Sequence, residues 1–232
     1  MLSFFRKDIF GNSHFVKKWV IRIIGIVSYR RFRGINNLII SGTENIKSLP
    51  DKNVLFISNH QTYFADASAI IHVINATLSG RSDSIKNVSY IWKPKLNLYY
   101  IAAKETMADG WLPKILSYAG SIPIERTWRE GGKDVKRDVN KVNIKAINSA
   151  LNDGWVITFP QGTTKPWMPV RKGTAHIIKS NKPILNIYQF NWLKFDMINM
   201  VSKIQTRLGF SCYGYYLKAQ KYISVSNRTQ LS

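Results

Sequence analysis

Cysteine, acidic residues and long apolar runs are all scarce in this sequence. The one cysteine, Cys212, excludes an intrachain disulfide framework and any zinc site built from several cysteines, and it favours a reducing compartment. The most apolar run, residues 19–29, is interrupted by Arg22 and is shorter than the roughly 18 to 20 residues of a bilayer span. Residues 1–11 mix charges of both signs and lack the apolar core of a secretory signal. We therefore expect neither a secretory leader nor a transmembrane helix.

The shortage of acids leaves a large positive charge. The chain has 13 Asp and Glu against 34 Lys and Arg, which gives a net charge of +21 at pH 7. Such an excess indicates an anionic partner: nucleic acid, a phosphorylated small molecule or an acidic membrane surface. Aromatic residues make up 12% of the chain and suit a membrane interface or stacked bases equally well. A basic nucleic-acid-binding module is one alternative, but no helix-turn-helix, zinc knuckle or RNA-binding aromatic signature is present, so we expect no nucleic-acid partner.

An amphipathic helix is predicted near the N-terminus. Apolar residues recur there at helical spacing, at Phe15, Trp19, Ile23, Ile26 and Val27. Basic residues surround and follow them, at Lys17, Lys18, Arg22, Arg30, Arg31 and Arg33. Two arrangements fit this pattern, and both can hold at once: the apolar stripe packs on the domain, or the helix lies among the headgroups of an anionic membrane. We expect a membrane-associated segment, because the basic residues cluster at both ends of the helix.

Strands and helices alternate through the middle of the chain. Nearly continuous apolar runs predict strands at residues 38–41, 54–58, 98–103, 121–124, 155–159 and 183–188. Helical patterns fall between them, at residues 66–74, 110–118, 133–152 and 173–180. This order predicts an α/β fold in which helices flank a mixed sheet on both faces. We divide the chain into a basic membrane-binding segment (1–36), the α/β domain (37–189) and an atypical C-terminal segment (190–232), where only residues 197–208 favour a helix.

Polar residues follow three of these strands, at the edge where an open α/β sheet carries its functional side chains. His60 follows one strand, and Asp66 opens the next helix. A carboxylate beside a histidine can fix its tautomer and stabilise the imidazolium, so the pair fits a general base; otherwise Asp66 only caps its helix. Arg126 follows a second strand and can pair with a phosphate, while Gly162-Thr163 follows a third and presents backbone N–H groups to an anion.

Four segments, in order along the chain, carry a resemblance to a known family. They are Asn59-His60-Gln61-Thr62-Tyr63-Phe64-Ala65-Asp66, Gly120-Ser121-Ile122-Pro123-Ile124-Glu125-Arg126, Phe159-Pro160-Gln161-Gly162-Thr163 and Pro183-Ile184. Together they resemble the four sequence blocks of the glycerolipid acyltransferase family, whose best-known members are lysophosphatidate (1-acylglycerol-3-phosphate) O-acyltransferases. The resemblance covers residues 38–188.

The resemblance implies transfer of an acyl chain from acyl-CoA or acyl carrier protein to a lysophospholipid such as lysophosphatidate, in phospholipid biosynthesis. It implies no acyl-enzyme, no metal and no prosthetic group, and a peripheral or monotopic protein at the cytoplasmic face of the cell membrane. His60 would be the general base of the catalytic pair, and Asp66 would orient it. The residues expected to bind substrate are Arg126, Gln161, Gly162, Thr163, Lys165 and Arg171, with Lys172 as an alternative to the last two.

Three positions depart from the family's pattern. Five residues separate His60 from Asp66 where the family has four, and a bulge in the turn would absorb the extra residue. Gln161 stands where the family has glutamate, which keeps hydrogen bonding and removes a charge, and Asn186 stands where the family has proline. The departures leave two alternatives open: an acyltransferase of aminolipid synthesis, such as glycine or ornithine lipids, and a catalytically inert membrane-bound relative.

Overall fold

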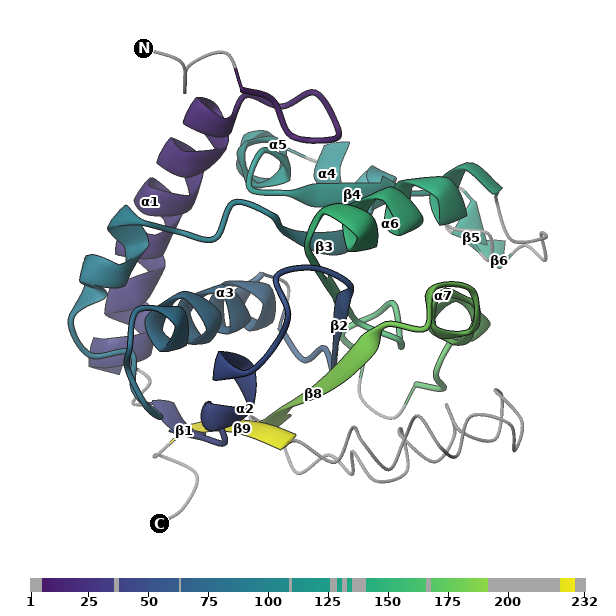
Figure 1. Ribbon diagram of the computed structural model, residues 1–232. Helices are drawn as coiled ribbons and strands as arrows, with labels where there is room; N and C mark the ends of the chain where they lie inside the picture. Colours follow the sequence, from purple (N-terminus) through teal and green to yellow (C-terminus); the bar gives the residue numbers. More distant parts are fainter. Residues whose placement is uncertain are drawn as a thin grey trace.

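The computed structural model describes residues 6–35, 38–62, 64–108, 110–125, 129–130, 133–134, 141–165, 168–191 and 222–227. Its α/β fold (Figure 1) is built on a seven-stranded sheet with the order β1-β9-β8-β2-β7-β3-β4. The strands are β1 (Leu38–Ser41), β2 (Val54–Ser58), β3 (Leu98–Ala103), β4 (Ser121–Ile124), β7 (Trp155–Thr158), β8 (Ile184–Asn191) and β9 (Tyr222–Asn227). Neighbouring strands are parallel except β1, which runs antiparallel to β9 at one edge. The prediction of a mixed sheet is therefore confirmed.

Helices connect the strands and cover the sheet. They are α1 (His14–Arg30), α2 (Glu44–Lys47), α3 (Ala65–Leu78), α4 (Lys104–Ala108), α5 (Trp111–Ser117), α6 (Lys141–Asp153) and α7 (Lys172–Asn181), with a π-helical turn at Arg31–Ile35 and a 3₁₀ turn at Val88–Trp92. The helix predicted at 133–152 is wrong at its start, because β6 (Lys133–Asp134) pairs with β5 (Arg129–Glu130). The intervening Gly131-Gly132 is a hairpin signal, and it outweighs the helical pattern that follows it.

The central strand β2 explains how the sheet acquires two cores. Successive side chains of a strand point to opposite faces. Val54 and Phe56 belong to a cluster that includes residues of α1 and α3, whereas Leu55 and Ile57 belong to a cluster that includes residues of α6 and α7. Figure 1 shows these two pairs of helices on opposite sides of the sheet. The four consecutive apolar residues of β2, residues 54–57, are therefore required at this place, because both faces of the strand are buried.

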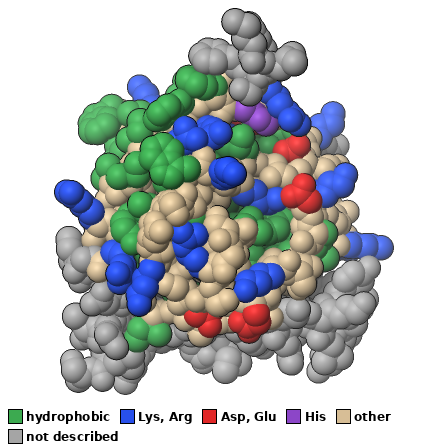
Figure 2. All heavy atoms as spheres, turned by 60° about the vertical axis from the view of Figure 1, so that its left-hand side comes forward, with side chains coloured by type: hydrophobic (Ala, Val, Ile, Leu, Met, Phe, Trp, Pro, Cys, Tyr) green, Lys and Arg blue, Asp and Glu red, His purple; other side chains and the backbone are tan. Residues whose placement is uncertain are grey.

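Helix α1 contacts the domain through the face that the apolar pattern did not indicate. Lys17, Ile21 and Gly25 are its buried residues, and Gly25 lies so close to Ile91 that an added Cβ would be 2.5 Å from that side chain. The predicted apolar stripe instead has exposed fractions between 37% for Phe15 and 69% for Val27. Packing of this stripe on the domain, the first of the two arrangements, is therefore wrong. Figure 2 shows this side of the molecule, where hydrophobic side chains lie among Lys and Arg side chains.

Lys17 differs from the other bases of the segment. Its side chain is fully buried, lies 3.5 Å from the Asp8 carboxylate and sits 4.1 Å above the Tyr99 ring. Burial lowers the pKa of Lys17 to about 8, although Asp8 opposes this shift. Lys17 therefore cannot meet membrane headgroups, contrary to its place in the predicted basic set. In the part of the chain that the structure describes, no helix has both the length and the apolar content to cross a bilayer.

The C-terminal segment contributes to the sheet. Strand β9 lies between β1 and β8 and pairs with both, so it connects the first and the last strand of the α/β domain within the sheet. The helix favoured at residues 197–208 and the thiol of Cys212 lie outside the described residues.

Candidate active site

The loop after β2 brings His60 and Asp66 together. His60 Nδ1 lies 3.0 Å from Asp66 Oδ2, and the Asp66 side chain is fully buried. Because a carboxylate only accepts, Nδ1 carries the proton of this hydrogen bond and donates it. Nε2 of the neutral ring is then the nitrogen with a free lone pair. This is the tautomer that a general base needs.

The same carboxylate organises the loop that separates the two residues. Asp66 Oδ2 also accepts from the backbone N–H groups of Gln61 (2.7 Å) and Thr62 (2.9 Å), and Oδ1 accepts from the Thr62 hydroxyl (2.7 Å). Thr62 Oγ1 in turn accepts from the Asp66 backbone N–H at 3.1 Å. The Thr62 hydroxyl thus accepts from one N–H group of the first turn of α3, and the Asp66 carboxylate holds His60. A separation of five residues is accommodated without loss of the contact.

The Phe159 ring packs against one face of the His60 ring and helps to fix its orientation. The two rings are stacked with their centroids 4.3 Å apart and an angle of 25° between their planes. The His60 side chain keeps 17% of its surface exposed. Phe159 comes from the end of β7, beside β2 in the sheet, so two parallel strands position one imidazole.

The loop after β7 is closed by short backbone contacts. Gly162 has a φ of +64° and donates its N–H to the Phe159 carbonyl, a turn conformation that other residues adopt at a cost. Gln161 is buried, and its Nε2 donates to the backbone carbonyl of Met168 at 3.1 Å. A carboxylate cannot donate this bond, so glutamine at this position serves the shape of the loop and removes a charge.

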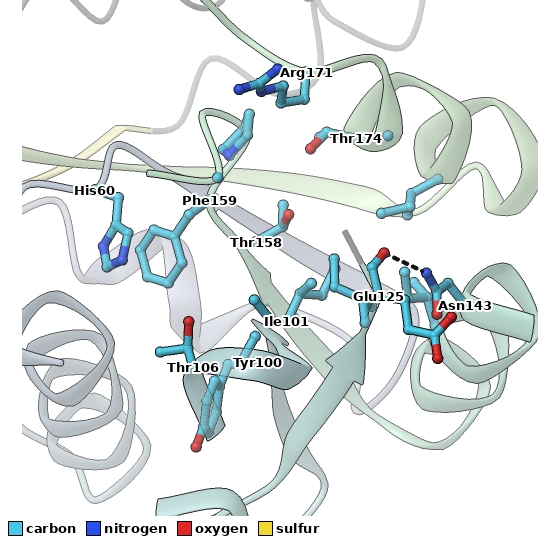
Figure 3. A pocket seen from close by; sticks show the side chains of 18 of the residues that line it. His60, Tyr100, Ile101, Thr106, Glu125, Asn143, Thr158, Phe159, Arg171 and Thr174 are labelled. Carbon is cyan, nitrogen blue, oxygen red and sulfur yellow. Dashed lines mark hydrogen bonds between the residues drawn. The ribbon is translucent and has the colours of Figure 1, made fainter. Parts of the chain in front are cut away.

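A cavity of about 360 Å³ begins at His60 and extends over the carboxyl ends of β3, β4 and β7. Side chains of α4, α6 and α7 close it, and most of the lining is apolar; Ile101, Ile124, Ile144, Ile147 and Ile177 are examples. Figure 3 shows His60 and Phe159 at one side of this cavity and Glu125 with Asn143 at the other. Tyr100 also lines it but donates its hydroxyl to the Leu116 carbonyl at 2.7 Å, and burial raises its pKa.

The predicted substrate-binding residues are distributed unequally around this cavity. Gly162 and Arg171 line it, together with Lys172. Gln161 and Thr163 do not line it. Gln161 instead stabilises the loop through its hydrogen bond to Met168, and Thr163 Oγ1 accepts from the backbone N–H of Lys165. The Lys165 side chain is exposed. Arg126 lies outside the described residues.

Several residues that line the cavity belong to no recognisable motif, so the sequence alone could not predict that they lie there. Thr158, at the end of β7, and Thr174, in the first turn of α7, are nearly fully buried and face the cavity. Asn143 of α6 donates to the backbone carbonyl of Glu125 at 3.1 Å. Only the folded sheet brings these residues to one place.

A buried histidine fixes α3, the helix that carries Asp66, against α1. His72 Nε2 lies 2.9 Å from the Ser28 hydroxyl of α1, and its Nδ1 lies 2.7 Å from the Tyr90 hydroxyl. Ser28 donates to the Ile24 carbonyl, so the His72 ring donates through Nε2 and accepts from Tyr90. Burial lowers the pKa of His72 to about 4, and the ring is therefore neutral at pH 7.

A His–Asp pair at the carboxyl edge of an open α/β sheet places a candidate general base beside a largely apolar cavity, which suits a substrate with an apolar chain. The family model described as Acyltransferase matches residues 37–188. The chain therefore belongs to this family, the glycerolipid acyltransferases that include the lysophosphatidate acyltransferases, and the family implies acyl transfer in glycerolipid synthesis. Comparison with curated proteins gave no match, and comparison with solved structures gave none.

Proposed function

We propose that this protein transfers an acyl chain from a thioester, acyl-CoA or acyl carrier protein, to the free hydroxyl of a lysophospholipid such as lysophosphatidate. The observation that carries the proposal is the His60–Asp66 hydrogen bond at the mouth of an apolar cavity. His60 Nε2 removes the hydroxyl proton as the acceptor oxygen attacks the thioester carbonyl. The tetrahedral intermediate then collapses, the C–S bond breaks, and the thiol leaves with the proton that the imidazolium returns. No resident cofactor takes part in these steps.

The lining of the cavity supports a substrate that combines an apolar chain with an anionic group. Isoleucines from β3, β4, α6 and α7 offer apolar surface for an acyl chain. Arg171 and Lys172 bring positive charge to the same cavity, and a phosphate is the anion that such side chains bind well. We assign the binding of the acceptor's anionic group to Arg171 and Lys172, with Arg126 and Lys165 as further contacts.

We also propose that the protein docks on an anionic membrane at the cytoplasmic face. Two exposed apolar groups support this: the outer stripe of α1 and the face of α5 with Trp111 (74% exposed), Leu112 and Ile115. Isolated apolar side chains are common on surfaces, but a group of this size with basic neighbours is typical of interfacial binding. Arg22 lies between the Trp19 and Trp92 rings, 5.0 Å from each centroid, and so places a cation at the level of the aromatic side chains.

The chemical proposal is tested by the release of free thiol from acyl-CoA or acyl carrier protein in the presence of lysophosphatidate. His60→Ala should reduce the rate by about 10²- to 10⁴-fold, whereas His14→Ala, which does not line the cavity, should leave it unchanged. A folded His60→Ala variant with the rate of the wild type would contradict the assignment. Labelled acyl donor with a total lipid extract identifies the acceptor: an acylated aminolipid would replace the acceptor named here, and the absence of any acylated lipid would indicate an inert relative.

The membrane proposal is tested by co-sedimentation with phosphatidylglycerol–phosphatidylcholine vesicles. Ile23→Asp places a charge in the outer stripe of α1 and should release the protein from the vesicles. Val142→Asp is the matched control, because Val142 is 71% exposed on α6, on the opposite side of the sheet from α1. Equal binding of both variants would refute docking through α1.

A further inference from the structure

The flat face of an aromatic ring lies against the imidazole that the proposed reaction protonates. The Phe159 and His60 rings are stacked, with 4.3 Å between their centroids and 25° between their planes. Figure 3 shows the two rings together at one side of the cavity. The face of a phenyl ring carries partial negative charge, so it attracts a cation that lies over it within about 6 Å of the centroid. An imidazolium gains this attraction, and a neutral imidazole does not.

The backbone and the core hold the Phe159 ring in place. Phe159 directly follows β7, and its carbonyl accepts from the Gly162 N–H at 2.9 Å. The next carbonyl, of Pro160, accepts from the Arg171 N–H at 2.8 Å. The Phe159 side chain packs against the core cluster that includes residues of α1 and α3. The ring face therefore has its position before any charge forms on His60, and no reorganisation is needed when the charge appears.

The charges near His60 give limited support to an imidazolium. Asp66 is its direct partner, but this carboxylate also accepts hydrogen bonds from the backbone N–H groups of Gln61 and Thr62 and from the Thr62 hydroxyl. The other described residues of the cavity that can carry charge are Tyr100, Glu125, Arg171, Lys172 and His176. The arginine and the lysine of this set outnumber its one carboxylate, so the cavity disfavours a further positive charge. An uncharged group that stabilises a cation is suited to this place.

We propose that Phe159 is a catalytic residue, whose ring face stabilises the positive charge that His60 acquires when Nε2 takes the proton of the acceptor. The inference rests on the proposed function, because it needs His60 to act as the base. Phe159 forms no bond and takes no proton: the proton moves from the acceptor hydroxyl to Nε2 and then to the leaving thiolate. An aliphatic side chain could hold the imidazole by packing alone, so the charge of the ring face separates a catalytic role from a purely structural one.

Fluorination of Phe159 tests this role, since fluorine withdraws electrons from the ring face and changes the size of the ring little. Monofluoro-, difluoro- and trifluorophenylalanine are placed at residue 159 of the full chain. The rate of thiol release from acyl-CoA in the presence of lysophosphatidate is measured in the pH-independent region of each variant's profile. It should fall at each step, by about two- to fivefold over the series, because the imidazolium loses its cation–π partner.

An NMR titration of the His60 ring measures the same contact without turnover. The chain has four histidines, and the spectrum of His60→Ala identifies the His60 signal. The pH at which half of the His60 rings are protonated should fall by about 0.5 to 1 over the series. The same series at Phe10 is the control, because Phe10 packs edge-on against Tyr99 and does not line the cavity. It should leave both the rate and the titration unchanged.

The two measurements separate failure of this inference from failure of the proposed function. In an active wild type, equal titrations across the Phe159 series would refute the cation–π contact. A shifted titration with equal rates would refute the catalytic role of Phe159 and leave the proposed acyl transfer intact. A wild type that releases no thiol would overturn the proposed function, and the catalytic role of Phe159 with it, whatever the titration shows.

Discussion

Substitution of Asp66 by asparagine should separate the charge of this residue from its role in holding the loop. Asp66 Oδ2 accepts from two backbone N–H groups, of Gln61 and Thr62, as well as from His60. Backbone donors cannot reverse their polarity, so an asparagine has to place its oxygen where Oδ2 stands. Its amide nitrogen then faces Thr62 Oγ1, which can accept. The tautomer of His60 is therefore retained, and only the negative charge beside the imidazolium is lost.

The magnitudes follow from the same contacts. A hydrogen bond to a charged group contributes about 1 kcal/mol more than a neutral one, so two backbone bonds predict that Asp66→Asn loses about 2 kcal/mol of unfolding free energy. Asp66→Ala removes the acceptor from both of these partly buried donors, at about 2 kcal/mol each, and should lose about 4 kcal/mol. For catalysis, loss of the charge should slow Asp66→Asn by about ten- to hundredfold, less than the loss expected for His60→Ala.

Denaturant unfolding and the rate of thiol release measure the two quantities on the same preparations. The predicted orientation of the asparagine amide, with its oxygen toward the two backbone N–H groups, would be refuted if Asp66→Asn and Asp66→Ala unfolded at the same denaturant concentration. It would also be refuted if Asp66→Asn were as slow as His60→Ala, because the amide would then have turned and His60 would have the wrong tautomer. Circular dichroism of each variant checks that the fold is intact before the rates are compared.

Three further predictions concern stability. Burial lowers the pKa of His72 from 6.5 to about 4, so below pH 6.5 the unfolded chain binds a proton that the folded chain does not. The unfolding free energy should therefore fall by about 3 kcal/mol from pH 7 to pH 4, and denaturant curves of His72→Gln should show a smaller fall. Gly154→Ala should lower the melting temperature by more than about 5 °C, because its Cβ would stand 1.9 Å from the Asn97 carbonyl oxygen, whereas Gly173→Ala has open space and should not. Gln161→Glu, which restores the family's residue, should destabilise the protein by about 1–3 kcal/mol in the same assay, because a carboxylate would face a carbonyl that now accepts a hydrogen bond.

Five strands, β1, β2, β3, β4 and β7, match their predicted bounds to within one residue, and the reason lies in their burial. Strand β8 extends three residues beyond its predicted end, and β9 and the β5–β6 hairpin were not predicted. In β2 every side chain is buried, since both faces of the sheet are covered, and four of its five residues are apolar. A buried parallel strand has no polar alternation that could blur its ends. The order of strands also brings His60 and Asp66 to the edge of the sheet where functional residues gather, as the sequence indicates.

Other features depend on long-range packing and could not be predicted. The stripe on α1 has helical spacing, but spacing alone does not say which face meets the domain; the inner face is set by Gly25, which admits Ile91, and by Lys17, which finds Asp8. Thr158 and Thr174 are ordinary residues of a strand and a helix until the sheet places both in one cavity. Gly154 follows α6 as a cap would, yet its φ is not positive, and its absent side chain serves close contact with Asn97.

The inner and outer faces of α1 connect the proposed membrane surface to the proposed chemistry. Ser28, on the inner side, contacts His72 in the middle of α3, and the Ser68 hydroxyl of the same helix donates to Ser28 at 3.0 Å. The first turn of α3 carries Asp66, which holds both His60 and the loop between them. A surface that binds the outer stripe of α1 therefore stands in a fixed orientation to His60, because two packed helices and not a flexible linker separate them. On the proposed membrane docking, an acceptor that remains in the membrane would need a base held at a constant height above that surface, and the Ser28–His72 contact would contribute to this constraint.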